Sequence, residues 1–300
     1  MIKPALPLIL AAATLSACAV GPRYQHPATP PQAVGPFAST QVGQAVSDPV
    51  SPTWWRLYQA PVLDRLVEQA LAENQNLKVA AANLDYAEAL TGEARTNLLP
   101  TTDLSAGANY GRGATANAAA AAAGRSHAKS AWSYSTGFTA AYQVDLFGRV
   151  RRTIEAARAN AEEAKAAEDA VRVTVAAETT SAYVQACGYA AQAAIARRSL
   201  DTARKTYDLT ARRRVLGAVS DFDLAQARAT LEQAKAVVPG LDGQRRNALL
   251  ELTALLGKTP SEIPAEAAAC VAPPRLSRPL PVGDGAALLR RRPDVRQAER

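Results

Sequence analysis

The fold is decided by the stretch 132-WSYSTGFTAAYQVDLFGRVRR-152, in which an alternating pattern gives way to a helical one. Up to residue 145, large or apolar side chains alternate with small or polar ones, which is the two-residue period of a β-strand with two unlike faces. The even-numbered face comprises Trp132, Tyr134, Thr136, Phe138, Ala140, Tyr142 and Val144. The odd-numbered face comprises Ser133, Ser135, Gly137, Thr139, Ala141, Gln143 and Asp145.

A second alternating segment, residues 103–110, precedes this one. Its even-numbered residues are Leu104, Ala106, Ala108 and Tyr110, and its odd-numbered residues are Asp103, Ser105, Gly107 and Asn109. Both lengths suit strands that cross an outer membrane, with Trp132, Tyr134, Phe138, Tyr142 and Val144 facing lipid and Ser133, Ser135, Thr139, Gln143 and Asp145 facing a water-filled lumen. We expect a transmembrane β-hairpin over residues 100–147, with 111–131 as a mobile external loop. A soluble hairpin with one buried face satisfies the same period and remains an alternative.

The helical part that follows is unusually long. Residues 149–216 contain no proline, and as one helix they would extend about 90 to 100 Å. Local charge pairs such as Glu162 with Lys165 and Glu168 with Arg172 accompany a narrow apolar seam, which indicates coiled-coil packing. The seam consists of Ile154, Ala157, Ala161, Ala164, Val171 and Val175.

The partner of this helix is expected next along the chain. A turn at Gly217 leads into a second helix beginning near Asp221, so that residues 148–258 form a long helical hairpin. Ser220 and Asp223 have the spacing of a capping box, with Asp in place of the usual Glu.

Helical periodicity also covers residues 62–99, where Asn74-Gln75-Asn76 can interrupt it. Two other segments lack it. Residues 18–61 are rich in Pro, Gly and Ser and predict an extended arm, docked near its end by the Trp54-Trp55 pair. Residues 259–284 predict a linker.

The N-terminus has the outline of a secretory signal. Residues 5–13 are uncharged and apolar but too short to span a bilayer as a helix. Because Leu15-Ser16-Ala17-Cys18 resembles a bacterial lipobox, we expect residues 1–17 to be removed and Cys18 to be acylated and anchored in outer-membrane lipid. A plain signal peptide with an incidental Cys is the alternative, and it predicts release into the periplasm.

Composition argues against several other functions. The net charge is +7, but Arg residues alternate with acidic residues along the helices and no nucleic-acid motif occurs, so no nucleic-acid partner is expected. The two histidines, His26 and His127, lie in no metal-ligand or catalytic spacing, and neither a phosphate loop nor a nucleophile elbow is present. We therefore expect no metal, no cofactor and no enzyme activity.

The cysteines do not form a disulfide framework. Cys187 is interpreted as a small buried apolar residue of the long helix, and Cys270 as a residue of a Pro- and Ala-rich loop. The periplasm would permit a bond between them, but the sequence disfavours it.

Several motifs together resemble one family. They are CAVGPRYQHP at 18–27, the Trp54-Trp55 pair, YQVDLFGRVRR at 142–152, RRVLGAVSDFDLAQA at 213–227, LTALLG at 252–257 and LLRRRPDVRQAER at 288–300. In this order, over nearly the whole chain, they resemble the TolC-like outer-membrane factors of tripartite efflux pumps, and most closely their lipidated OprM/NodT-type branch.

The resemblance implies a fold and a function that spacing alone does not. The implied fold class is a mixed α/β membrane protein, with long coiled-coil helices in a periplasmic α-barrel and a transmembrane β-hairpin contributing to a shared trimeric β-barrel. The implied function is a passive conduit that exports drugs or other small molecules across the outer membrane. The implied partners are two further copies in a homotrimer, a periplasmic adaptor protein and an inner-membrane RND-type transporter.

The resemblance also assigns a role to the turn of the helical hairpin. The family's pattern of Arg, Gly, Ser or Thr, and Asp matches Arg213, Gly217, Ser220 and Asp223, which are then expected to form an adaptor-contact tip. A well-capped turn without a partner is the alternative, because any tight turn needs Gly and a capping Ser.

A periplasmic lipoprotein adaptor with a coiled-coil hairpin is the competing function. An adaptor would need lipoyl-like β half-motifs on both sides of its hairpin, whereas this sequence has a pair of alternating strands. Residues 285–300 resemble the opening of a second structural repeat, with Leu289 and Val295 matching Leu71 and Leu77. The tandem halves of the family therefore predict roughly 170 to 200 further residues in the native gene, and no conducting channel from these 300 residues alone.

Overall fold

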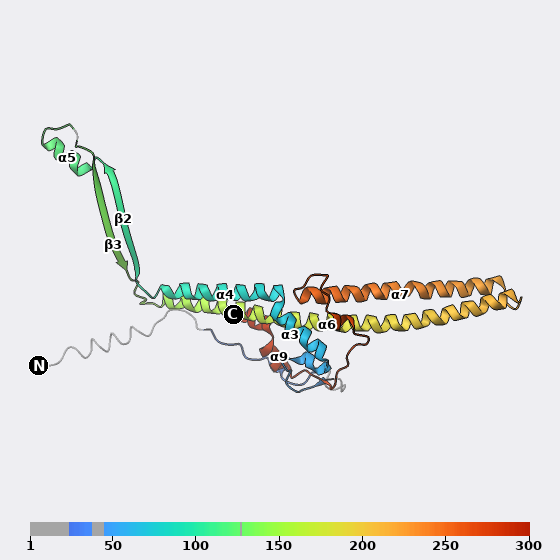
Figure 1. Ribbon diagram of the computed structural model, residues 1–300. Helices are drawn as coiled ribbons and strands as arrows, with labels where there is room; N and C mark the ends of the chain where they lie inside the picture. Colours follow the sequence, from blue (N-terminus) through green and yellow to red (C-terminus); the bar gives the residue numbers. More distant parts are fainter. Residues whose placement is uncertain (1–23, 38–44, 127) are drawn as a thin grey trace. The chain divides into compact units, whose positions relative to one another are not determined.

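The computed structural model describes residues 24–37, 45–126 and 128–300. The signal segment 1–17 and the expected lipidation site Cys18 lie outside these residues. The described elements are η1 Pro31–Ala33, β1 Ala45–Val46, η2 Trp54–Tyr58, α3 Pro61–Glu73, α4 Gln75–Thr96, β2 Thr101–Gly111, α5 Ala114–Ala122, β3 Ala131–Ala141, α6 Arg149–Val215, α7 Asp221–Leu255, α8 Ala265–Ala268, β4 Leu280–Pro281, α9 Gly285–Arg291 and α10 Pro293–Glu299 (Figure 1).

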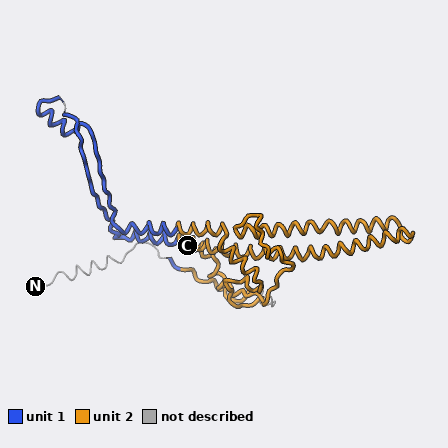
Figure 2. Tube along the Cα trace, in the orientation of Figure 1, with its two compact units in different colours: residues 1–25, 87–159 blue, residues 26–86, 160–300 orange. Residues whose placement is uncertain are grey.

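The chain divides into two compact units (Figure 2). Unit 1 comprises residues 1–25 and 87–159, and unit 2 comprises residues 26–86 and 160–300. In the part of the chain that the structure describes, no helix is long and apolar enough to cross a membrane.

Unit 1 contains the β-hairpin. Strands β2 and β3 pair antiparallel from Thr101 opposite Ala141 to Gly111 opposite Ala131. Next to the hairpin, Ala94 of α4 packs against Val150 and Ile154 of α6 in a small apolar cluster. The pairing of two strands was predicted from their alternation, and their register is a new observation.

The strand that we predicted to reach Asp145 is shorter. Strand β3 ends at Ala141, so Tyr142, Gln143, Val144 and Asp145 follow it. The reason is local, because the Asp145 carboxylate accepts hydrogen bonds from the backbone N–H groups of Val150 (3.1 Å) and Arg151 (3.0 Å). A carboxylate in this position satisfies free N–H groups at the start of α6, so residue 145 belongs to the entry into the helix.

The connection between the strands also differs from the expected mobile loop. Residues 114–122 form helix α5, because this Ala-rich run has the highest intrinsic helix propensity. The helix ends at Ala122, and the chain then turns at Gly124, where φ is +72° and the Arg125 N–H donates to the Ala120 carbonyl at 2.8 Å.

Unit 2 contains the main apolar core. Helix α3 and η2 pack against the middle of α6, the end of α7 and the short helix α8. The buried residues of this core are Trp55, Leu63, Leu66, Val67, Ala70, Val175, Ala176, Ala182, Tyr183, Ala186, Cys187, Ala248, Leu249, Leu252, Leu256 and Ala267. The predicted docking of the arm through its Trp pair is confirmed, since Trp55 lies in this core and Trp54 packs against it.

Asn74 separates α3 from α4, as the sequence suggested. Its side-chain oxygen accepts a hydrogen bond from the Leu77 N–H (3.1 Å) and caps α4, while its amide donates to the Leu255 carbonyl (2.9 Å) at the end of α7. A buried Asn thus joins the break between two helices to the terminus of a third. Gly257, just beyond, has φ of +68° and lies against the Glu73 carbonyl.

Helices α6 and α7 lie antiparallel beyond this core, in orange and yellow in Figure 1. Arg197 of α6 donates two hydrogen bonds to the Asp242 carboxylate of α7, at 2.6 and 2.7 Å. The predicted pair of Glu168 with Arg172 is present at 2.8 Å.

The other predicted charge pair of α6 was wrong. Lys165 pairs with the buried Glu168 at 2.7 Å, and Glu162 pairs with Arg300 instead. The cause is tertiary, because α10 supplies a cation that local spacing could not anticipate. The two cations beside Glu168 donate hydrogen bonds to its carboxylate and lower its pKa.

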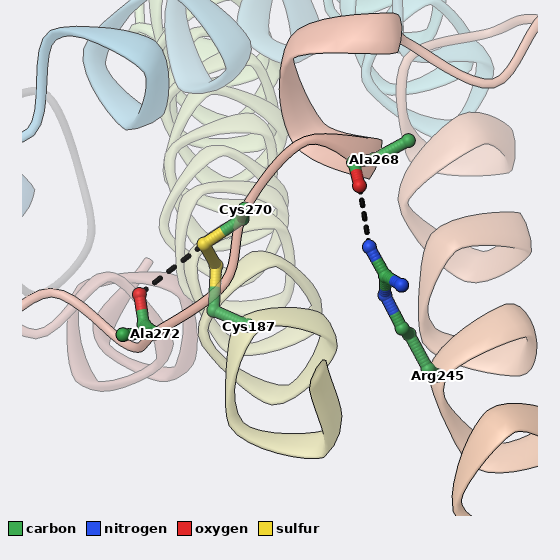
Figure 3. Close-up of a disulfide and its surroundings, with 5 residues drawn as sticks. All are labelled: Cys187, Arg245, Ala268, Cys270 and Ala272. Atoms are coloured by element: carbon green, nitrogen blue, oxygen red, sulfur yellow. Dashed lines mark hydrogen bonds between the residues drawn. A yellow bond between two sulfur atoms is a disulfide. The ribbon is translucent and has the colours of Figure 1, made fainter. Parts of the chain in front are cut away.

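The expectation about the cysteines was also wrong. Cys187 is fully buried, as predicted, but it forms a disulfide with Cys270 across 83 residues of sequence (Figure 3). The bond joins α6 to the segment after α8, where the Ala272 carbonyl oxygen lies 3.2 Å from Cys270 Sγ. The Arg245 guanidinium of α7 donates to the Ala268 carbonyl beside it.

Two further contacts join the arm to the linker. The two-residue strands β1 and β4 pair in parallel, and the Val282 N–H donates to the Val46 carbonyl at 2.9 Å. Gly285 packs so closely that a Cβ there would lie 2.4 Å from the Ala33 carbonyl oxygen. Strands this short leave no periodicity in the sequence, and their pairing was not predicted from it.

Gly257 provides a test of the junction between α3, α4 and α7. A Cβ at Gly257 would lie 2.6 Å from the Glu73 carbonyl oxygen, and the positive φ adds strain for any other residue. We expect Gly257→Ala to lower the free energy of unfolding by about 2 kcal/mol or more, measured by urea titration of the purified chain. Gly240→Ala is the matched control, because a Cβ there meets nothing within 4 Å and helix propensity favours Ala. Equal unfolding midpoints for the two variants would contradict this account of the junction.

Candidate functional site

The tip of the helical hairpin ends α6 with a left-handed glycine. Gly217 has φ of +73°, its N–H donates to the Arg214 carbonyl (3.0 Å), and the Ala218 N–H donates to the Arg213 carbonyl (2.9 Å). This pair of bonds is a Schellman motif, which satisfies the last carbonyls of the helix and reverses the chain.

Helix α7 starts with a complete capping box. The Asp223 N–H donates to Ser220 Oγ at 3.2 Å, and the Ser220 N–H donates to Asp223 Oδ2 at 2.9 Å. The Ser220 hydroxyl also donates to the same carboxylate at 2.6 Å, and these side-chain and backbone hydrogen bonds lower the pKa of Asp223. The reciprocal cap fixes the direction in which α7 leaves the turn.

An ion pair between the two helices also closes the turn. Arg214 Nε and Nη2 donate to the two Asp221 carboxylate oxygens, at 2.6 and 2.8 Å. Hydrogen bonding followed by charge attraction raises the pKa of Arg214 and lowers that of Asp221. The planar guanidinium matches the carboxylate, so this pair orients the turn as well as holding it.

Large apolar side chains next to this capping box and ion pair are exposed to solvent. Val215 is 87% exposed, Leu216 81% and Phe222 75%. Apolar side chains this exposed, gathered on one rigid turn, are typical of a surface that contacts another protein. We call these three residues, with Gly217, the tip surface.

The structure brings together three of the four predicted tip residues in defined roles. Gly217 forms the turn, and Ser220 and Asp223 form the cap. Arg213 is exposed and contributes its backbone carbonyl, and its side chain has no ion-pair partner in the described part of the chain. Arg214, Asp221 and the exposed apolar residues are further members of the tip that the family's pattern does not contain, although two opposite charges seven positions apart across an expected turn are a usable signal.

The β-hairpin of unit 1 has two unlike faces because of its register. Leu104 lies opposite Phe138, Ala108 opposite Tyr134, and Tyr110 opposite Trp132, so the two apolar alternations lie on one face. Leu104 and Tyr134 are each 77% exposed and Phe138 is 70% exposed. Nothing among the described residues covers this face.

Aromatic residues gather at the end of the hairpin that carries α5. The Tyr110 and Trp132 rings lie 5.2 Å apart between centroids, and the Trp132 and Tyr134 rings stack at 6.2 Å. An aromatic band at the end of an apolar strand face is typical of the boundary between lipid and water.

The other face of the hairpin carries small and polar side chains. Ser133 and Ser105 donate hydroxyl hydrogen bonds to the carbonyls of Asn109 (3.2 Å) and Gly137 (3.4 Å) on the opposite strand. A Cβ at Gly137 would lie 3.0 Å from Ser105 Oγ, so small side chains are required there.

Within the described residues no group of three or more His, Cys, Asp or Glu side chains could hold a metal ion. His26 contacts Glu299 of α10, and His127 lies outside the described residues.

A two-faced β-hairpin and a long, capped helical hairpin on one chain define the fold of outer-membrane channel subunits. The chain belongs to the outer membrane efflux protein family, whose model matches residues 66–258. It is 30% identical over its whole length to outer membrane protein OprJ of Pseudomonas aeruginosa, and 28% identical over 95% of its length to nodulation protein T of Rhizobium leguminosarum bv. trifolii. The solved outer-membrane channel OprN matches 94% of the chain at 32% identity, with a TM-score of 0.82.

The chain spans 61% of the length of OprJ and of the OprN channel, and 59% of nodulation protein T. The family is one of efflux channels and not of enzymes, and it supports the predicted channel component over the alternative of a periplasmic adaptor.

Proposed function

We propose that this protein is the outer-membrane channel component of a tripartite efflux pump. It is a passive conduit that exports drugs or other small molecules and catalyses no reaction. The observation that carries the proposal is the combination, on one chain of this family, of a hairpin with an uncovered apolar face and a rigid hairpin tip with exposed apolar side chains.

The β-hairpin supports a place in the outer membrane. Both strands are eleven residues long. A tilted strand needs about 9–11 residues to span a bilayer, so this length is sufficient. The even face then meets lipid and the odd face meets a water-filled lumen. Because β2 and β3 pair only with each other in the described structure, their outer edges need further strands, which a homotrimer with a shared β-barrel would supply.

Substitutions on adjacent residues of β3 test this placement. Phe138→Arg should strongly reduce the protein recovered in the outer-membrane fraction, because an Arg on the lipid face near mid-membrane costs about 2 to 4 kcal/mol. Thr139→Arg is the control, since it lies on the other face directly opposite Asp103. Equal recovery of the two variants would count against a membrane hairpin.

The tip surface supports contact with a periplasmic adaptor that links the channel to an inner-membrane RND-type transporter. The ion pair of Arg214 with Asp221 and the capping box of Ser220 with Asp223 hold the turn rigid. The side chains of Val215, Leu216 and Phe222 remain exposed. A preformed apolar surface loses little conformational freedom on binding, which favours contact with a partner.

Gly217 tests the tip without touching the membrane part. Gly217→Val, introduced into the native gene, places a β-branched residue at φ of +73°, so the turn must change, and we expect at least a several-fold loss of drug resistance with normal outer-membrane recovery. Gly217→Asn is the matched variant, because Asn tolerates the left-handed conformation, and it should retain most resistance. Full resistance with Gly217→Val, or its loss from the membrane, would show that the tip is misplaced.

The N-terminus supports a lipid anchor through Cys18, since Leu15-Ser16-Ala17-Cys18 resembles a lipobox. We expect labelled palmitate to be incorporated into the wild type and not into Cys18→Ala, with the mature chain beginning at Cys18 by mass spectrometry. An unmodified Cys18 in membrane-extracted protein would exclude the anchor and leave the channel proposal intact.

A further inference from the structure

The Cys187–Cys270 disulfide joins two sulfur atoms in very different surroundings. Cys187 is 0% exposed and lies in the core of unit 2, with residues of α3 and α7 in the same cluster. Cys270 is half-buried, on the segment that follows α8 and packs on the outside of that core (Figure 3). One thiol of the reduced chain is therefore enclosed by the fold, and the other lies at its surface.

Apart from the disulfide, the α8 segment is held mainly by contacts that open easily. Glu266 pairs with Arg65 of α3, and the Ala268 carbonyl accepts from Arg245 of α7, with both members of the first pair substantially exposed. Exposed ion pairs contribute little to stability, so in the reduced protein this short segment can separate from the core while α3, α6 and α7 remain packed. Ala267 is buried in the core, and the half-buried Ile263 and Ala268 also pack against it.

Forming the bond removes two protons and two electrons from two thiols, and a disulfide of another molecule can accept the electrons. In the first exchange, one cysteine thiolate attacks the oxidant's disulfide, which makes a mixed disulfide and releases one oxidant thiol. In the second, the other cysteine thiolate attacks the sulfur of the first cysteine, which makes the Cys187–Cys270 bond and releases the second oxidant thiol. Access to the oxidant decides which cysteine acts first.

We infer that Cys270 is the cysteine that exchanges with a protein dithiol–disulfide oxidant and that Cys187 resolves the mixed disulfide, so that the α8 segment is locked onto α6 after the core of unit 2 has formed. The inference rests on the proposed function for the oxidising compartment, because the periplasm keeps disulfides formed. An oxidant protein can approach Cys270 on its surface segment directly, whereas it can reach the buried Cys187 only after that segment has moved off the core.

The order of exchange is tested on the purified, reduced full chain with oxidised glutathione as the probe. Cys270 in the Cys187→Ala variant should form the glutathione adduct at least about ten-fold faster than Cys187 in the Cys270→Ala variant, measured by quenched mass spectrometry. In denaturing urea the two rates should converge, because the difference comes from the fold. Equal rates for the two folded variants would overturn the inference.

If a cysteine variant does not fold, the order of exchange is measured on the reduced wild-type protein. Brief exposure to oxidised glutathione followed by acid quenching should place the first adduct on Cys270, and a first adduct on Cys187 overturns the inference.

The class of oxidant is tested in cells by acid trapping. Cys187→Ala should accumulate a reductant-sensitive adduct with a second protein through Cys270, several-fold above Cys270→Ala. Equal amounts of adduct in the two variants would exclude exchange through Cys270. The absence of adduct from both variants, while the wild type is fully oxidised, would also exclude it. Outer-membrane recovery and drug resistance of the wild type are scored in parallel, so that a failure of the proposed function is distinguished from a failure of the exchange order.

Discussion

The close approach of small side chains along α6 is the constraint on which the rest of the structure depends. A helix of 67 residues cannot be stabilised by a single globular core, so partners must cover it along its length. Between Val175 and Ala193 its buried residues recur every three or four positions, and many of them are Ala, including Ala176, Ala186 and Ala190. Each Ala buries little area, but it lets neighbouring backbones approach and loses no side-chain entropy on packing. Leu, Val and aromatic residues concentrate instead where α3, α7 and η2 meet α6.

Local patterns of sequence were sufficient for the elements that repeat over many residues. The two-residue alternation of β2 and β3, the uninterrupted α6 and the capping box at Ser220 each arise from contacts between residues close in sequence, which composition and spacing reveal. The end of β3 was misplaced because Asp145 continues the alternation while its carboxylate caps α6, and only the hydrogen bonds distinguish the two roles. Helix α5 differs from the expected loop because the helix propensity of its Ala-rich run outweighs the flanking glycines.

Contacts between distant residues could not be predicted in the same way. The Cys187–Cys270 bond depends on where α8 packs along α6, and the residues near either cysteine do not indicate that position. Asn74 was recognised as a break, but its hydrogen bond to Leu255 depends on the position of α7. At the tip, the motif named Arg213, whereas the structure pairs Arg214 with Asp221. A motif records which residues recur, and side-chain direction on a helix decides which of two adjacent arginines meets a carboxylate.

The continuity of α6 also limits how the length of this chain can change in evolution. One residue inserted or deleted in a helix rotates everything beyond it by about 100° about the axis, which would turn the buried face of α6 away from α7. A change of seven residues rotates it by only about 20°, and a matching change in α7 would keep their contacts. Relatives of this protein are therefore expected to differ in the length of the helical hairpin by paired, near-heptad steps.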